Sequence, residues 1–143
     1  MAAERRAEVT WKGELFSGSG TITSVGSGAF GPLDVTWPSR AEKSDGRTSP
    51  EELIAAAHAS CYCMALSNGL TKAGTPPTEL RASATVTFVP GTGITKSALT
   101  VVGVVEGIDA AGFQAAAEAA KDGCPVSGAL KGNVELSVEA SLA

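Results

Sequence analysis

The sequence has little basic charge, few aromatic residues and no uninterrupted hydrophobic segment of membrane-spanning length. It holds 11 Lys and Arg against 15 Asp and Glu, a net charge of −4, and its longest basic run is Arg5-Arg6. Nucleic-acid-binding surfaces need clustered positive charge, so that class of protein is set aside. The most apolar stretch, 53–70, is broken by His58, Ser60 and the segment 67–69. It is therefore not expected to span a membrane.

The first residues also lack the features of a secretory signal, because no apolar segment follows the two arginines. We therefore expect a cytoplasmic protein. Its 143 residues, 43% of them hydrophobic, are enough for one folded domain over 1–143. In a reducing compartment the three cysteines suggest reactive thiols or metal ligands before structural disulfides.

Hydrophobic periodicity changes along the chain. Short strands are predicted at 8–11, 20–25 and 34–37, with glycines in the turns between them, and the polar segment 38–48 predicts a loop. Ser49, Pro50 and Glu52 have the pattern of a capping box, so a helix is expected from Pro50 to about Gly69, or as far as Lys72. The scarcity of polar residues in this helix predicts burial on most of its sides.

The second half of the chain predicts a hairpin followed by two helices and a strand. Alternating residues at 80–88 and a second strand at 94–105 are joined by a turn at 90–93. Asp109 is expected to cap an Ala-rich helix that ends at 122–123, Pro125 begins a short helix to about Lys131, and a last strand covers 134–140. This order, with hairpin-like spacing, predicts an α+β fold with a largely antiparallel sheet.

The three cysteines have different expected environments. Cys61 and Cys63 point about 200° apart on a helix, so they cannot serve one site together, and a lone helix cysteine is most simply a small core residue. Cys124 precedes Pro125 at the start of a helix, where unpaired N–H groups favour a thiolate, although an incidental cap is equally compatible. Cys61 lies roughly 15 Å along its helix, too far from the N-terminus for the same help. Position therefore makes Cys124 the more acidic thiol.

Two cysteine segments carry a resemblance to a known family. The segments around Cys61, namely Thr48-Ser49-Pro50-Glu51-Glu52-Leu53, Ala56-Ala57-His58-Ala59-Ser60-Cys61 and Met64-Ala65-Leu66-Ser67, closely resemble the first-cysteine helix of the OsmC/Ohr family. This family comprises osmotically inducible proteins and organic hydroperoxide resistance proteins. Gly107-Ile108-Asp109-Ala110 and Gly123-Cys124-Pro125-Val126-Ser127-Gly128-Ala129-Leu130 resemble its second-cysteine segment, and Trp11-Lys12-Gly13 and Gly18-Ser19-Gly20-Thr21 fit its opening hairpin. The Ala-His-Ala lead-in is closer to the OsmC branch.

This resemblance implies an α+β fold with a long buried central helix, assembled as an intertwined homodimer with active sites at the interface. It also implies a thiol peroxidase without a prosthetic cofactor, which reduces organic hydroperoxides and, less well, hydrogen peroxide. By the family pattern Cys61 attacks the peroxide and becomes a sulfenic acid, and Cys124 resolves it as a disulfide. An external dithiol, such as a lipoyl-bearing protein, then reduces that disulfide.

The resemblance also implies a charged pair beside the thiols. Arg40 matches the family arginine that stabilises the thiolate and orients the peroxide, and Glu51 matches its carboxylate partner. The loop that follows Arg40 is about one residue longer than the family pattern and contains Arg47, a second basic candidate. Glu51 precedes Cys61 by ten residues, roughly 15 Å along one helix, so we predict a composite site to which the two subunits contribute.

The sequence leaves alternatives open. His58, the only histidine, has the spacing to act as a base or to join Cys61 and Cys124 in a metal-binding module, but packing is the simpler role for a lone histidine. A redox sensor or small-molecule-binding protein with the same fold and little turnover is the other functional alternative. The natural peroxide, the physiological reductant and the role of Cys63 are not determined by the sequence.

Overall fold

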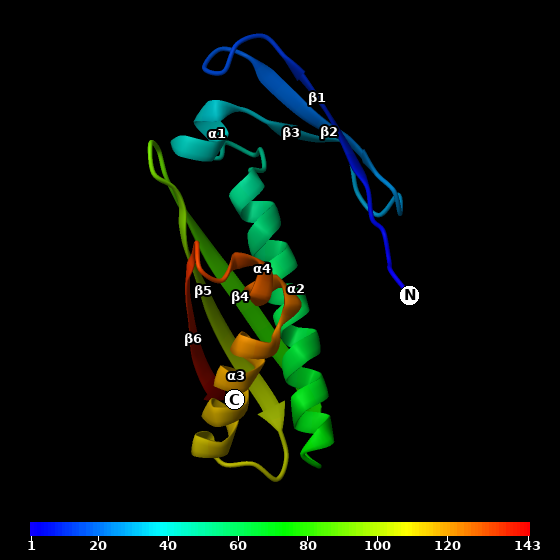
Figure 1. Cartoon of the computed structure of the whole chain (residues 1–143), viewed down its shortest axis with the longest axis vertical. Helices are drawn as coiled ribbons and strands as arrows, with labels where there is room; N and C mark the ends of the chain where they lie inside the picture. The colour runs from blue at the N-terminus through cyan, green and yellow to red at the C-terminus, as the bar shows by residue number, and fades with distance from the viewer. The chain divides into compact units, whose positions relative to one another are not determined.

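The computed structural model describes all 143 residues, and the chain forms two compact units, Met1–Pro50 and Glu51–Ala143 (Figure 1). The first unit is a three-stranded antiparallel sheet in the order β1-β2-β3 followed by a short helix. Its elements are β1 (Ala7–Lys12), β2 (Ser19–Val25), β3 (Leu33–Val35) and α1 (Trp37–Ala41). Gly20 of β2 lies under the Trp11 ring, where a Cβ atom would come within 2.6 Å of Trp11 Cε3, so this strand position has room only for glycine.

Helix α1 corrects the prediction of a strand to Trp37 and a loop from residue 38. Thr36 and Ser39 form a reciprocal capping box: the Ser39 N–H donates to Thr36 Oγ1 at 3.1 Å, and the Thr36 N–H donates to Ser39 Oγ at 2.9 Å. Pro38 occupies the first turn, where its missing N–H costs nothing. The local cap therefore outweighs the polar composition that predicted a loop.

The second unit contains one long helix, three strands and two shorter helices, in the predicted order. Helix α2 begins at the junction of the units. The elements are α2 (Pro50–Lys72), β4 (Pro77–Val89), β5 (Gly93–Val105), α3 (Ala110–Gly123), α4 (Pro125–Leu130) and β6 (Glu135–Leu142). The cap predicted for α3 is confirmed, since the Asp109 carboxylate accepts from the Gly112 N–H at 2.7 Å.

The sheet of this unit has the order β4-β5-β6 and is mixed. Strands β4 and β5 form the predicted hairpin, whose turn contains Gly91 at φ +83° and Gly93 at φ +122°. Strand β6 pairs with β5 in parallel, from Lys96↔Glu135 to Gly103↔Leu142. The expected hairpin-like spacing was wrong here, because residues 106–134 with their two helices make a crossover connection, and a crossover returns the chain in the parallel direction.

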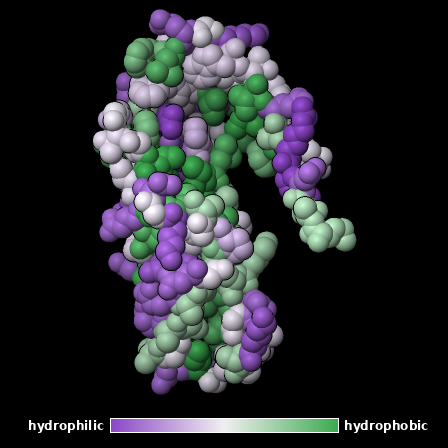
Figure 2. All heavy atoms as spheres, viewed as in Figure 1, coloured by the Kyte–Doolittle hydropathy of each residue, from purple (hydrophilic) through white to green (hydrophobic).

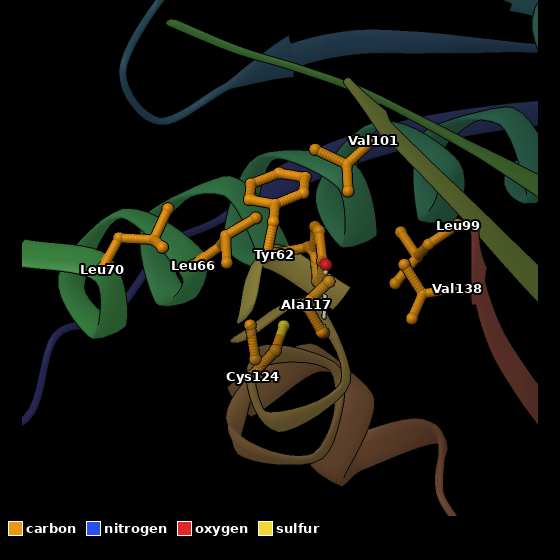
Figure 3. Packing of buried hydrophobic residues seen from close by; sticks show 10 residues of the cluster. Tyr62, Leu66, Leu70, Leu99, Val101, Ala117, Cys124 and Val138 are labelled. Atoms are coloured by element: carbon orange, nitrogen blue, oxygen red, sulfur yellow. Dashed lines mark hydrogen bonds between the residues drawn. The ribbon is translucent and has the colours of Figure 1, made fainter. Parts of the chain in front are cut away.

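Helices α2 and α3 supply apolar side chains to a core on one face of this sheet (Figure 3). Tyr62, Leu66 and Leu70 of α2 are buried with sheet residues Leu99, Val101 and Val138. Figure 3 also shows the hydrogen bond that the Tyr62 hydroxyl donates to the Ala117 carbonyl of α3, at 3.0 Å. This bond satisfies a polar atom that would otherwise be costly to bury, and it ties the two helices together.

The predicted burial of α2 on most sides does not hold within one chain. Its buried residues lie along one face, and Met64 on another face is 72% exposed. By length and composition α2 would suffice to cross a membrane, but core helices of globular proteins also meet this weak criterion. Tyr62, Leu66 and Leu70 of α2 pack into the core of the unit. Apolar residues reach the surface elsewhere too, as the green areas among purple ones show (Figure 2).

Candidate active site

The structure brings Cys61 and Cys124 together. Cys61 lies midway along α2 and is half-buried, and Cys124 precedes α4 as its N-cap residue and is 1% exposed. The two cysteines are not joined by a disulfide, and they lie close enough for each to shift the pKa of the other. Figure 3 shows Cys124 at the edge of the apolar core, beside Ala117. Sixty-three positions apart in sequence, these two sulfurs meet because the α3–α4 connection returns to α2.

Cys124 is the more acidic of the two thiols, as its position at a helix N-cap predicts. Burial raises its pKa, but hydrogen bonds from the Ser127 N–H, the Cys61 thiol, the Val126 N–H and the Ser127 hydroxyl outweigh burial and lower the pKa below its ordinary value. The sulfur does not form a capping bond of standard geometry, so these N–H groups act on it through a looser approach. The first turn of α4 therefore favours a thiolate at Cys124.

Cys61 has the opposite tendency within this unit. Burial raises the pKa of its thiol, the Val126 N–H works against this, and the interaction with Cys124 raises the pKa further. No cation appears among these influences. An acidic Cys61 therefore requires a positive group beyond those that surround it here, as its distance from the N-terminus of α2 also predicts.

Cys61 opens onto a groove of about 700 Å³ between α2 and α3. Its walls are small and apolar, and Lys72 is the only charged residue on them. Lining residues include Met64, Ala65, Ala116, Ala119 and Pro125. Cys124 does not line this groove, so a molecule in it reaches the sulfur of Cys61 first.

Cys63 lies on a different side of α2, as its predicted 200° separation from Cys61 requires. It lines a second groove, bounded by Ser67 of α2 and Leu80 of β4. Burial raises the pKa of Cys63, which the Ala82 backbone only partly offsets. Its position separates it from the Cys61–Cys124 pair.

His58 is fully buried and bridges two serine hydroxyls. Its Nδ1 lies 2.6 Å from Ser97 Oγ and its Nε2 lies 2.8 Å from Ser127 Oγ. Burial lowers the pKa of His58, so the ring is neutral at pH 7. Both nitrogens are occupied, which agrees with the simpler prediction of a satisfied internal histidine. No group of three or more His, Cys, Asp or Glu side chains has a geometry suited to a metal ion.

The predicted charged residues lie at the end of the first unit and the start of the second. Arg40 is in the last turn of α1, and Arg47 follows in the loop, where it lies 3.8 Å from Asp45 and is exposed. Glu51 is in the first turn of α2, ten residues before Cys61. As site residues, Arg40 and Glu51 stay predictions.

Two residues of the site were missed by the sequence analysis, namely Ser97 on β5 and Ser127 in the first turn of α4. Both are buried, at 0% and 2% exposed. Serine is common and usually exposed, so composition gives no signal for Ser97. The position of Ser127 did give a signal. It is the third residue after the N-cap residue Cys124, and side chains at these two positions of a helix are neighbours.

Comparison with known proteins identifies relatives over nearly the whole chain. Residues 43–139 match the family model described as OsmC-like protein. The curated protein Peroxiredoxin OsmC of Escherichia coli (strain K12) is 39% identical over 142 residues, covering 97% of this chain and 98% of the E. coli protein. The protein of the same name from Shigella flexneri matches to the same extent.

Solved structures share the fold. The organic hydroperoxide resistance protein OhrB of Bacillus subtilis is 27% identical, with a TM-score of 0.68 over 95% of this chain and 98% of that one. An organic hydroperoxide resistance protein from Elizabethkingia anophelis is 23% identical and matches all of both chains with a TM-score of 0.71. At that identity the second likeness bears on the fold alone, and it agrees with the α+β arrangement described above.

Proposed function

Because the chain belongs to the OsmC-like family, we propose that this protein is a thiol-dependent peroxidase that reduces organic hydroperoxides. Relatives named Peroxiredoxin OsmC and organic hydroperoxide resistance protein support a peroxidase role. The proposal goes further in assigning the chemistry to Cys61 and Cys124, with organic hydroperoxides preferred over hydrogen peroxide. The protein thereby acts as an antioxidant oxidoreductase in the cytoplasm.

The contact between the Cys61 and Cys124 thiols beside an apolar groove is the observation that carries this proposal. Cys61 faces the groove, so it meets the peroxide, and Cys124 lies behind it within reach of the same sulfur. The small apolar walls suit the hydrocarbon part of an alkyl or lipid hydroperoxide better than they suit hydrogen peroxide. This arrangement supports a two-step oxidation within one chain.

In the first step the Cys61 thiolate attacks the terminal peroxide oxygen. The O–O bond breaks, the alkoxide leaves and takes a proton to become an alcohol, and Cys61 becomes a sulfenic acid. In the second step the Cys124 thiolate attacks the Cys61 sulfur. The S–S bond forms as the S–O bond breaks, and the departing hydroxide takes a proton to become water. An external dithiol, such as a dihydrolipoyl group on a protein, restores both thiols and is itself oxidised to a disulfide, so no prosthetic cofactor takes part.

Arg40 and Glu51 complete the proposed site. The surroundings of Cys61 within its own unit raise its pKa, so its thiolate needs a cation, and Arg40 is the residue that matches the family pattern. Glu51 holds that arginine in place through an ion pair. Since Glu51 lies about three helical turns from Cys61, we assign the two to sites completed by different subunits.

A homodimer is therefore part of the proposal. The exposed side of α2, with Met64 72% exposed, leaves apolar surface that one chain does not cover. The first unit also leaves apolar side chains exposed. Every residue of β1 is exposed, and Val9 and Trp11 are 59% and 41% exposed. Apolar surface of this kind favours burial against a second copy. The expected form in solution is a dimer, and a monomer with unchanged turnover would remove this part of the proposal.

The proposal is tested by mapping thiols after one equivalent of an alkyl hydroperoxide. The wild type is expected to lose about 2 Da and to yield a Cys61–Cys124 crosslinked peptide. Cys61→Ser is expected to yield none, and Cys63→Ser, a control on the other side of the helix, is expected to crosslink as the wild type does. Wild-type thiols that survive untouched would contradict the peroxidase assignment.

Turnover separates an enzyme from a sensor. With dihydrolipoamide supplied, the wild type is expected to consume many equivalents of alkyl hydroperoxide, and Arg40→Ala is expected to slow the first oxidation step. Oxidation that stops after one equivalent in the presence of the dithiol would instead identify a redox sensor with the same fold. Repeating the assay with hydrogen peroxide tests the substrate preference.

A further inference from the structure

Beside Cys124 lies a chain of hydrogen bonds to which the two oxidation steps described above assign no role. It runs from Ser97 on β5 through His58 on α2 to Ser127 on α4, and the Ser127 hydroxyl in turn interacts with the Cys124 sulfur. All four side chains are at most 2% exposed. Three elements of the fold thus converge on the sulfur that lies away from the groove.

Placement of Ser127 follows from the helix start. Cys124 is the N-cap residue of α4, Pro125 is its first helical residue, and Ser127 is therefore the third. Side chains at the N-cap and the third helical position are neighbours, as in a capping box. From this position Ser127 Oγ lies 2.8 Å from His58 Nε2, and the Ser127 hydroxyl lowers the pKa of the neighbouring Cys124 thiol.

The direction of the chain depends on which nitrogen of His58 carries the proton. A hydroxyl has one proton to donate, so Ser127 can donate to Cys124 only if its oxygen accepts from His58 Nε2–H. The ring is neutral, so Nδ1 is then an acceptor, and it accepts from the Ser97 hydroxyl at 2.6 Å. With this tautomer every donor points toward the sulfur. Both serine hydroxyls fit either tautomer, and a Cys124 thiolate favours this one because it has no proton and can only accept from Ser127.

We propose that Ser97, His58 and Ser127 form a positioning chain that holds the Ser127 hydroxyl toward Cys124 and stabilises its thiolate. The proposal deepens the proposed function and rests on it for its role in turnover. His58 is a positioning residue here, since it touches neither the sulfur nor the peroxide and acts through Ser127. This assigns a role to the single histidine other than packing.

The chain matters in both disulfide steps. In resolution it keeps Cys124 ionised, so that the thiolate is ready to attack the Cys61 sulfenic acid and release water. In reduction it makes Cys124 the better leaving group, because a thiol of lower pKa leaves faster. A thiolate of the dithiol attacks the Cys61 sulfur, the S–S electron pair passes to Cys124, and the second thiol of the dithiol then displaces Cys61.

Access favours the same direction of attack. Cys61 lines the groove of about 700 Å³, and Cys124 is 1% exposed and does not line it. A reducing thiol therefore reaches the Cys61 sulfur, and the stabilised thiolate departs into the protein. Geometry and acidity thus assign the two sulfurs different roles in reduction.

Few other titratable groups act on Cys124. Helix α2 contributes two of them, Cys61 and Tyr62. The pKa of Tyr62 is raised mainly by burial, and further by Glu118 of α3 and by the cysteines. The sheet contributes Ser97, which does not titrate in this range. Tyr62 is the only tyrosine, and its raised pKa keeps phenolate absorbance away from the thiolate range.

The test is a titration of Cys124 in a Cys61→Ser, Cys63→Ser background, in which it is the only thiol, followed by thiolate absorbance at 240 nm. At pH values below the midpoint of the Cys124 titration, Ser127→Ala is expected to lower the fraction of thiolate about tenfold. The reason is that it removes a hydrogen bond to a charged group. His58→Leu, like Ser127→Ala, is expected to raise the pH at which Cys124 is half ionised. His58→Gln is expected to restore it, because its amide retains a donor for Ser127 and an acceptor for Ser97.

Ser60→Ala is the matched control, since Ser60 precedes Cys61 but donates to the Ala56 and Ala57 carbonyls of its own helix. Its midpoint is expected to equal that of the background. Thermal unfolding is recorded for each variant, and Ser127→Ala, which removes one oxygen atom, decides the matter if His58→Leu does not fold. A merely structural histidine would change the unfolding temperature and leave the midpoint in place.

A second measurement follows the attacked sulfur. Oxidised wild-type protein is treated with 2-mercaptoethanol, quenched with N-ethylmaleimide and mapped; the mercaptoethanol adduct is expected on Cys61 and the maleimide on Cys124. Adducts on Cys124, or midpoints of Ser127→Ala and His58→Leu equal to that of Ser60→Ala, would overturn the proposal. The titration uses no peroxide, so failure of the peroxidase assignment would not be mistaken for failure of the chain.

Discussion

Gly103→Ala places one methyl group in a close contact between the sheet and Phe113 of α3. Gly103 lies in β5, opposite Leu80 of β4 and Leu142 of β6. An added Cβ atom would lie 2.5 Å from Cζ and 2.7 Å from Cε1 of Phe113, whose ring is 1% exposed. Leu80 at 3.4 Å would not obstruct it. The substitution therefore tests how rigidly Phe113 of α3 is packed against the sheet.

Two opposing effects set the magnitude. Replacing a strand glycine by alanine contributes about 0.5–1 kcal/mol of stability by restricting the unfolded chain. Overpacking a rigid core costs about 1–3 kcal/mol, and Phe113 is a planar ring without a flexible end that could move aside. The second effect is larger, so Gly103→Ala is expected to lower the free energy of unfolding by about 1–2 kcal/mol.

Urea unfolding at fixed protein concentration measures this effect, because a dimer makes apparent stability depend on concentration. The double variant Gly103→Ala, Phe113→Leu is expected to recover about 1 kcal/mol relative to the sum of the single changes. Since α3 leads directly to Cys124, the single variant should also slow disulfide formation. A change in unfolding free energy within about 0.3 kcal/mol of zero, or no coupling with Phe113, would refute the reasoning.

Gly69→Ala is the matched control. Gly69 is inside α2, and a Cβ atom there would meet nothing within 4 Å. The same chemical change should therefore stabilise the protein, by about 0.5–1 kcal/mol. Opposite signs at Gly69 and Gly103 would show that local space decides the outcome.

Three further predictions concern single side chains. Tyr62→Phe removes the 3.0 Å hydrogen bond to Ala117 and should lower the unfolding free energy by about 1 kcal/mol in urea, with an unchanged value indicating that the bond contributes nothing net. Asp109→Ala removes the cap of α3 and should cost about 1 kcal/mol in the same assay, whereas Asp109→Asn should retain most of it. Burial lowers the pKa of His58 in the folded state, so below the ordinary value of 6.5 the unfolded state binds the additional proton, and stability should fall as pH falls below 6.5. This slope should be smaller in His58→Gln, and equal slopes would contradict it.

Local signals in the sequence predicted most elements of the fold. Pro50 marks the start of α2, Asp109 the cap of α3 and Pro125 the start of α4, because each acts on backbone groups within one helical turn. Helix α1 was missed although Thr36 and Ser39 form a capping box, since a five-residue helix has too little periodicity to stand out. The direction of β6 was missed because strand pairing depends on the path of the whole α3–α4 connection.

The sequence by itself determined the two thiol segments, the different faces of Cys61 and Cys63, and the acidity that a helix start favours at Cys124. These properties depend on neighbours within a turn or two, which helical geometry makes predictable. Only the tertiary structure decided that Cys124 meets Cys61, and that His58 reaches Ser97 and Ser127 at 39 and 69 positions along the chain. Such contacts arise where packing of α2, α3 and β5 closes distant segments around one core, and no local pattern records which hydroxyls will be buried there.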